Sequence, residues 1–147
     1  MQLSATVNWL VCREICVPGR AALVLTLPIR KGTAGSASPL HSLFGQARAD
    51  LPRRAPNSWK MTADLDKHWW VLNVETGKRE TEATFFPLEP NQIENAAPQK
   101  ASALPRGIRI ELQRSDQLLK SPPRLRGVLV LAGGHGYLIE APVTTSK

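Results

Sequence analysis

The two cysteines of the chain, Cys12 and Cys16, place the strongest constraint on how it can fold locally. A disulfide requires its two Cα atoms to lie roughly 4.4–6.8 Å apart. In a straight strand, residues four positions apart are separated by roughly 13 Å, so only a helical turn or a tight reversal could join this pair. The flanking segments 6–11 and 21–27 are rich in β-branched, aromatic and aliphatic residues, which favours strands. The sequence therefore predicts a strand, a tight reversal carrying both cysteines, a turn at Pro18-Gly19 and a second strand.

A bridge between these cysteines would close a ring of about five residues. In the chain-entropy model such a ring contributes about 2 kcal/mol, against nearly 5 kcal/mol for a loop of about 100 residues. It would be a weak cross-link, and a short ring near the surface is easily reduced, which suits thiol exchange. Arg13 favours a thiolate at Cys12 and Glu14 opposes it, so the sequence does not decide which cysteine is the nucleophile.

Two other interpretations of the cysteine pair stay open. The cysteines could be unlinked, buried and unreactive. Alternatively, both thiolates could bind a soft metal such as Cu(I) or zinc. Zinc normally takes four ligands, and no other Cys or His lies close in sequence to Cys12 and Cys16, so a metal site ranks below thiol exchange.

The segment 9–19, WLVCREICVPG, and the aliphatic run 22–28 that follows it resemble the cysteine region of a known family. This family is the periplasmic N-terminal region of DsbD/ScsB-type thiol:disulfide interchange proteins. Further matching pieces occur in the expected order, at 85–87, 96–99, 127–131 and 137–142. The resemblance implies an immunoglobulin-like β-sandwich, thiol:disulfide interchange through Cys12 and Cys16, and no cofactor. It also implies a periplasmic location, with periplasmic thioredoxin-like proteins or a membrane electron-transfer domain as partners.

The chain departs from this family before its cysteines. Family members have several strands and a capping loop ahead of the cysteine hairpin, whereas eleven residues precede Cys12 here. The membrane domain is also missing, since no stretch reaches the 18 or more apolar residues of a spanning helix. No signal peptide is visible in the first twenty residues. The sequence is therefore expected to be a truncated piece, with its export signal upstream.

The charge of the chain argues against a nucleic-acid partner. Nineteen basic and twelve acidic residues give a net charge of +7, but the basic residues are scattered. Nucleic-acid binding needs a clustered basic face. We expect a solvated basic surface, which could steer acidic partner proteins.

Breaker-rich segments divide the chain into three predicted parts. Residues 1–30 form the cysteine hairpin, 31–56 a linker with a short helix, and 57–147 an immunoglobulin-like sandwich. Ser38 is the expected helix N-cap, with Pro39 at the first helical position and Pro52 as the stop. The expected apolar stripe of this helix consists of Leu40, Leu43, Phe44, Ala47 and Leu51.

From residue 59 onward the sequence alternates with a period of two, as β-strands do. The strands are expected within 59–65, 70–74, 82–87, 108–112, 126–132 and 137–142. Residues 88–106 are expected to be irregular and anchored by Ile93, and 143–147 to be a frayed tail. Trp59, Trp69 and Trp70 are expected to supply core plus one partly exposed ring rather than a ligand-stacking platform.

The remaining polar residues indicate no further site. The sequence lacks GxSxG, HExxH and Walker motifs, and Gly133–Gly136 is predicted to be a turn, not a phosphate loop. His41, His68 and His135 are expected to be exposed rather than ligands. Because an isolated hairpin is marginal in water, we expect the hairpin to pack on the sandwich or to form a homo-oligomer through its exposed edges.

Overall fold

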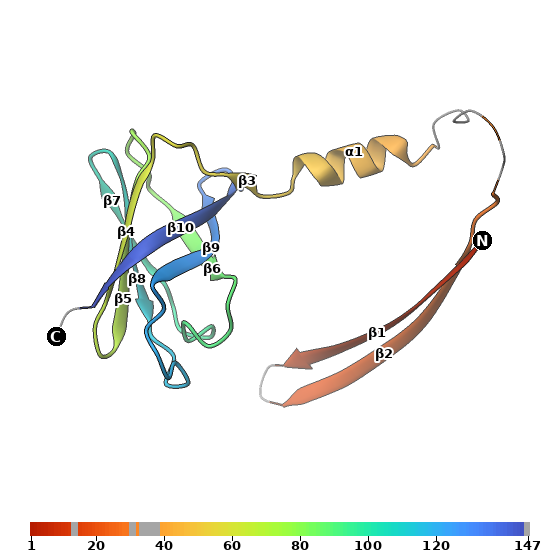
Figure 1. Ribbon diagram of the computed structural model, residues 1–147, viewed down its shortest axis with the longest axis horizontal. Coiled ribbons are helices and arrows are strands. Elements are labelled where there is room, and N and C mark those ends of the chain that lie inside the picture. The colour runs from red at the N-terminus through yellow and green to blue at the C-terminus, as the bar shows by residue number, and fades with distance from the viewer. Residues whose placement is uncertain (13–14, 30–31, 33–38, 146–147) are drawn as a thin grey trace. The chain divides into compact units, whose positions relative to one another are not determined.

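The computed structural model describes residues 1–12, 15–29, 32 and 39–145 of the chain (Figure 1). The fold is mainly β, with an immunoglobulin-like sandwich, a preceding hairpin and one short helix, as predicted. The chain divides into two compact units, Met1–Ser38 and Pro39–Lys147. The three predicted domain ranges remain a prediction.

The hairpin consists of β1 (Gln2–Cys12) and β2 (Cys16–Thr26), paired antiparallel without interruption. Two backbone hydrogen bonds of 2.8 Å join Met1 and Leu27, which makes this a hydrogen-bonded pair. Hydrogen-bonded and non-hydrogen-bonded pairs alternate in an antiparallel ladder. Every pair of odd-numbered residues is therefore hydrogen-bonded, and every pair of even-numbered residues is not.

The predicted turn at Pro18-Gly19 is wrong, and the alternation explains how a proline fits inside a strand instead. Both residues lie inside β2, opposite Leu10 and Trp9. Pro18 belongs to a non-hydrogen-bonded pair, so its missing N–H faces the free edge of the ribbon and no ladder bond is lost. At Gly19 a side chain would overlap the indole of Trp9, so the absent Cβ gives that ring its place.

The helix α1 (His41–Ala49) is shorter than predicted. Leu40 is its N-cap and makes no side-chain capping bond, while the predicted cap Ser38 lies outside the described residues. The stripe residues Leu40, Leu43 and Phe44 are between 56% and 59% exposed. The guanidinium of Arg48 lies 5.9 Å from the centre of the Phe44 ring, within the range of a cation–π contact.

Eight strands build the sandwich (Figure 1). They are β3 (Arg53–Arg54), β4 (Lys60–Leu65), β5 (Trp69–Glu75), β6 (Ala83–Pro87), β7 (Lys100–Leu104), β8 (Gly107–Gln113), β9 (Arg124–Leu131) and β10 (Gly136–Thr145). Their hydrogen-bonded order is β6-β9-β10-β4-β5-β8-β7, with β3 beside β10. The expected irregular stretch 88–106 therefore contains a strand that the sequence did not reveal.

Strand β10 joins the two layers. Gly136–Pro142 pairs antiparallel with β9, whereas Val143–Thr145 pairs parallel with β4. The change of partner falls immediately after Pro142, which has no N–H to donate to a ladder. Residues 143–145 are thus strand, and the expectation of a frayed tail is wrong for them.

The core lies between the two layers, as the period-two pattern predicts. Alternate residues of β4, β5, β8, β9 and β10 face inward, and Trp70 and Phe85 are fully buried. Trp59 packs on Tyr137 with ring centroids 4.8 Å apart, and Trp69 is 37% exposed beside Lys100. The three tryptophans form core plus one partly exposed ring and not a shared platform.

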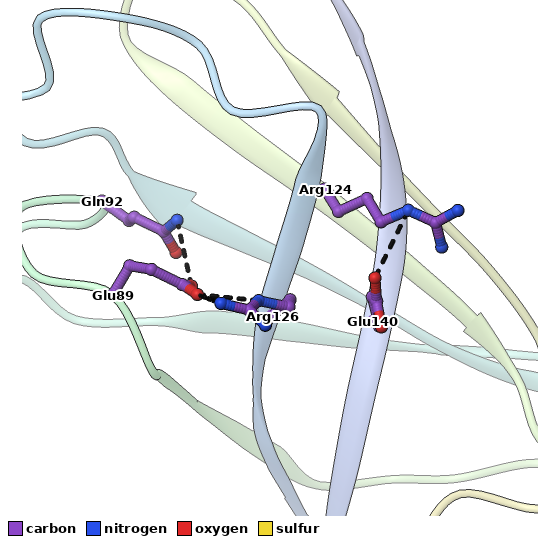
Figure 2. A network of polar contacts seen from close by, with 5 residues as sticks. All are labelled: Glu89, Gln92, Arg124, Arg126 and Glu140. Carbon is purple, nitrogen blue, oxygen red and sulfur yellow. Dashed lines mark hydrogen bonds and ion pairs between the residues drawn. The ribbon is translucent and has the colours of Figure 1, made fainter.

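Polar contacts tie the long connection after β6 to the sandwich. The indole N–H of Trp70 donates to the Gln92 carbonyl at 2.8 Å, and Ile93 is buried, as expected for an anchor. Figure 2 shows the Glu89 carboxylate accepting from both Arg126 and Gln92. The connection is irregular near residue 90, but these hydrogen bonds hold it against the sandwich.

Gly127 provides a test of core packing. It lies on β9, and a Cβ at this position would overlap the Phe85 ring and the backbone of Phe86. We expect Gly127→Ala to destabilise the sandwich by about 1–3 kcal/mol, the usual cost of overpacking. Urea unfolding followed by tryptophan fluorescence measures this. Gly45→Ala is the control, because its added methyl group meets nothing within 4 Å and should not lower the midpoint. Equal midpoints for both variants would contradict this packing.

The turn between β4 and β5 provides a test at low pH. The Asp66 carboxylate accepts the backbone N–H groups of His68 and Trp69, each at 2.7 Å. These bonds hold the pKa of Asp66 below its usual value of 3.8. Because the folded pKa is the lower one, the contribution of Asp66 to stability is complete above pH 3.8 and is lost as the pH falls through the folded pKa. NMR titration of the Asp66 carboxyl should give a midpoint below 3.8; a midpoint at or above that value contradicts the turn.

Candidate functional site

The closed end of the hairpin carries both cysteines. Cys12 and Cys16 lie directly opposite each other, on either side of the reversal, whereas the sequence predicted a reversal that carries both of them. They form a non-hydrogen-bonded pair, and the Cα atoms of such a pair are about 4.5 Å apart. This separation lies within the range that a disulfide requires. The backbone register therefore brings the pair within bonding distance with no change in the ladder.

Cys16 is exposed and disulfide-bonded. There is no free cysteine in the part of the chain that the structure describes. The side chain of Cys12 lies outside the described residues, as do Arg13 and Glu14, so their predicted effects on the thiolate stay predictions. The interpretation of both cysteines as buried and unlinked is wrong for Cys16, because its side chain reaches solvent.

The residues next to the cysteines form an accessible surface. In an antiparallel pair, directly opposite residues share a face, and every second residue returns to it. We call the face that carries Cys12 and Cys16 the cysteine face. The next pair on it is Leu10 with Pro18, both exposed, followed by Asn8 with Arg20. A shallow pocket in this part of the ribbon is lined by residues of both faces: Asn8, Leu10, Pro18 and Arg20 from the cysteine face, and Trp9 and Gly19 from the opposite face. A partner that approaches the cysteines would thus contact the apolar pair Leu10 and Pro18 and the cationic side chain of Arg20.

The opposite face of the hairpin is entirely apolar. We call it the apolar face; its residues are Leu3, Ala5, Val7, Trp9, Val11, Val17, Gly19, Ala21, Leu23 and Leu25. Trp9 lies across Gly19 and keeps 45% of its surface exposed. The local sequence showed only the aliphatic run 22–28 on the second strand. A reversal placed between the two cysteines would have set the first strand opposite this run and shown that the two strands share an apolar face.

The other candidate residues remain dispersed. His41, His68 and His135 are exposed, as predicted. Among the described residues, no group of three or more His, Cys, Asp or Glu side chains is placed to hold a metal ion. The Cu(I) alternative at Cys12 and Cys16 needs only two thiolates and stays a prediction. No helix in the described ranges is long and apolar enough to cross a membrane.

Comparison with known proteins identifies the fold but no sequence relative. No protein-family model matches the chain, and no curated protein matches it in sequence. A solved structure is similar, the N-terminal periplasmic domain of ScsB from Proteus mirabilis, with a TM-score of 0.65 and 12% identity. The alignment covers 96% of this chain and 58% of the solved chain, so the chain spans little more than half of that domain. The predicted resemblance is confirmed at the level of structure, and the chain has the fold of the N-terminal periplasmic domain of ScsB-type proteins.

Proposed function

We propose that the chain is a thiol:disulfide interchange module that works through Cys12 and Cys16. The observation that carries this proposal is the direct opposition of the two cysteines at the exposed end of a hairpin. The backbone pairing of β1 and β2 sets this separation, so opening and closing the bond would require no change in the ladder. The similarity to a ScsB periplasmic domain supports the same chemistry.

The oxidised pair would act as an electron acceptor. A partner thiolate attacks one sulfur of the pair, and the bond between Cys12 and Cys16 breaks as a mixed disulfide forms. The displaced cysteine leaves as a thiolate. A second partner thiolate then attacks the mixed disulfide, so that the partner is oxidised and the pair gains two electrons and two protons. The reduced pair runs the same steps in reverse towards an oxidised partner.

The small ring favours exchange over a structural role. Three residues separate the two cysteines, so the ring contributes only about 2 kcal/mol to stability. Labile disulfides are typically exposed or strained, whereas structural ones resist reduction. The exposed Cys16 fits the first class.

The proposed partners are periplasmic thioredoxin-like proteins or a membrane electron-transfer domain, and the proposed location is the periplasm. Disulfides form and persist in that compartment. The similar solved domain is itself periplasmic. The apolar pair Leu10 and Pro18 beside the cysteines offers an uncharged surface that the residues around a partner's active site could contact.

Trapping experiments test the exchange chemistry. Single variants Cys12→Ser and Cys16→Ser should each leave one thiol. The partner is a thioredoxin-like protein that lacks its resolving cysteine and whose remaining cysteine is activated as a mixed disulfide with thionitrobenzoate. The thiolate of one variant should attack this disulfide, release thionitrobenzoate and accumulate a mixed disulfide between the two proteins. Non-reducing electrophoresis and mass spectrometry detect the adduct. The double variant is the control and should form none. If neither folded single variant forms an adduct, the chain does not exchange disulfides with this class of partner.

The redox potential separates exchange from a structural bond. We expect the wild-type pair to equilibrate with glutathione or dithiothreitol buffers at roughly −120 to −270 mV, the range of exchange proteins. Alkylation followed by mass spectrometry gives the reduced fraction at each buffer ratio. A potential below about −300 mV would assign the bond to structure instead.

A second candidate function is a non-catalytic interaction module in which the cysteine bond is structural. The apolar face, which has no cover within the hairpin unit, favours this alternative, because faces of that kind mark contact surfaces. This alternative predicts a very low redox potential for the cysteine pair and no mixed disulfide with a partner. The trapping experiment and the redox potential therefore distinguish it from exchange.

A further inference from the structure

The apolar face of the hairpin has no cover within its own unit. Its seven large side chains are between 43% and 65% exposed: Leu3, Val7, Trp9, Val11, Val17, Leu23 and Leu25. None of its residues is charged. The cysteine face is different, since Gln2, Ser4, Thr6, Asn8, Arg20 and Thr26 lie on it. The two faces of one ribbon are thus segregated by polarity.

Such a ribbon needs a covering surface. A two-stranded hairpin is marginally stable in water at best, and independent stability needs further strands or packing against an apolar face. A continuous apolar patch of this kind is uncommon on monomeric proteins and marks an association surface. The segregation of the faces tells which side is covered: the apolar one.

The area of the apolar face is sufficient for a dimer of modest stability. The seven large side chains are each about half exposed. Together they expose an apolar area on the order of 500 Å² per copy, given the area that a fully buried aliphatic or aromatic side chain removes from water. Two copies would bury on the order of 1,000 Å² together, which is the lower limit for a specific interface. Since no side chain of the face is charged, two identical faces meet without like-charge repulsion inside the contact.

We propose that two copies of this chain associate through the apolar faces of their hairpins, related by a twofold axis. In such an isologous contact each face serves as the cover of the other. The cysteine face of each copy points away from the contact, so both pairs stay accessible in the dimer. Contact through the faces differs from pairing of strand edges, because it needs no backbone hydrogen bonds between the copies.

Adjacent residues of β2 supply a matched test on the whole 147-residue chain. Leu25 lies on the apolar face and is 56% exposed; Val24 lies on the cysteine face and is 62% exposed. We expect the wild type to sediment as a dimer at micromolar concentrations, with twice the monomer mass of 16.1 kDa. Leu25→Lys should raise the dissociation constant by at least about tenfold, because it buries an unpaired charge. Val24→Lys, with the same added charge, should change it by less than about twofold.

Salt and protection experiments keep the proposal testable if Leu25→Lys unfolds the hairpin. Each copy carries +7, so raising the salt concentration should tighten the wild-type dimer by screening repulsion between the copies. Hydroxyl-radical footprinting of the wild type should show Trp9 and Leu25 becoming protected as concentration rises, with Leu10 unchanged. A monomer throughout the concentration range, assemblies larger than a dimer, or equal weakening by both lysine variants would overturn the proposal. Since both variants keep Cys12 and Cys16, these outcomes do not depend on the exchange chemistry.

Discussion

The backbone ladder between β1 and β2 determines the position of every side chain in the hairpin. Its register sets Cys12 against Cys16 and sorts the remaining residues into a cysteine face and an apolar face. A slip of one residue in one strand would move that strand's side chains to the opposite face and separate the two sulfurs. The proposed exchange chemistry and the proposed association therefore both depend on the same set of backbone hydrogen bonds.

The sandwich depends on a different device, a strand that changes partners. Because β10 pairs first with β9 and then with β4, its side chains Ile139 and Ala141 enter the core from the junction of the two layers. The layers are then held by covalent continuity as well as by packing. Phe85 contributes from the other side by filling the space above Gly127, so a small residue on β9 permits a large one on β6.

Much of this fold could be predicted from local sequence, and the failures have physical causes. Strands β4, β5 and β8 alternate cleanly because each has one buried face. Strand β7 was missed because Lys100–Leu104 lies at the edge of the sheet, where small and polar residues do not alternate in burial. The end of β10 was missed because Pro142 resembles a terminator, whereas in the fold it marks a change of partner. The Pro18-Gly19 turn was predicted from residue preference alone, and tertiary pairing overrode it.

The candidate site was predicted in part. Spacing and composition led to the cysteine pair and to a reversal that carries it. They did not reveal the apolar face, because its ten residues come from two strands and become a set only when the register is known. Register is a long-range property, and no window of sequence on one strand contains it.

Pro18 has a consequence for how the hairpin meets other β-structure. Its nitrogen faces the free edge of β2, one pair away from the cysteines, and offers no donor there. A foreign strand docking on that edge would lose a hydrogen bond beside the cysteine pair. Natural sheets use proline in this position to prevent runaway strand addition. The same residue therefore opposes the growth of an intermolecular sheet beside the exposed Cys16, and it leaves that side chain accessible to the partner thiolate of the proposed exchange.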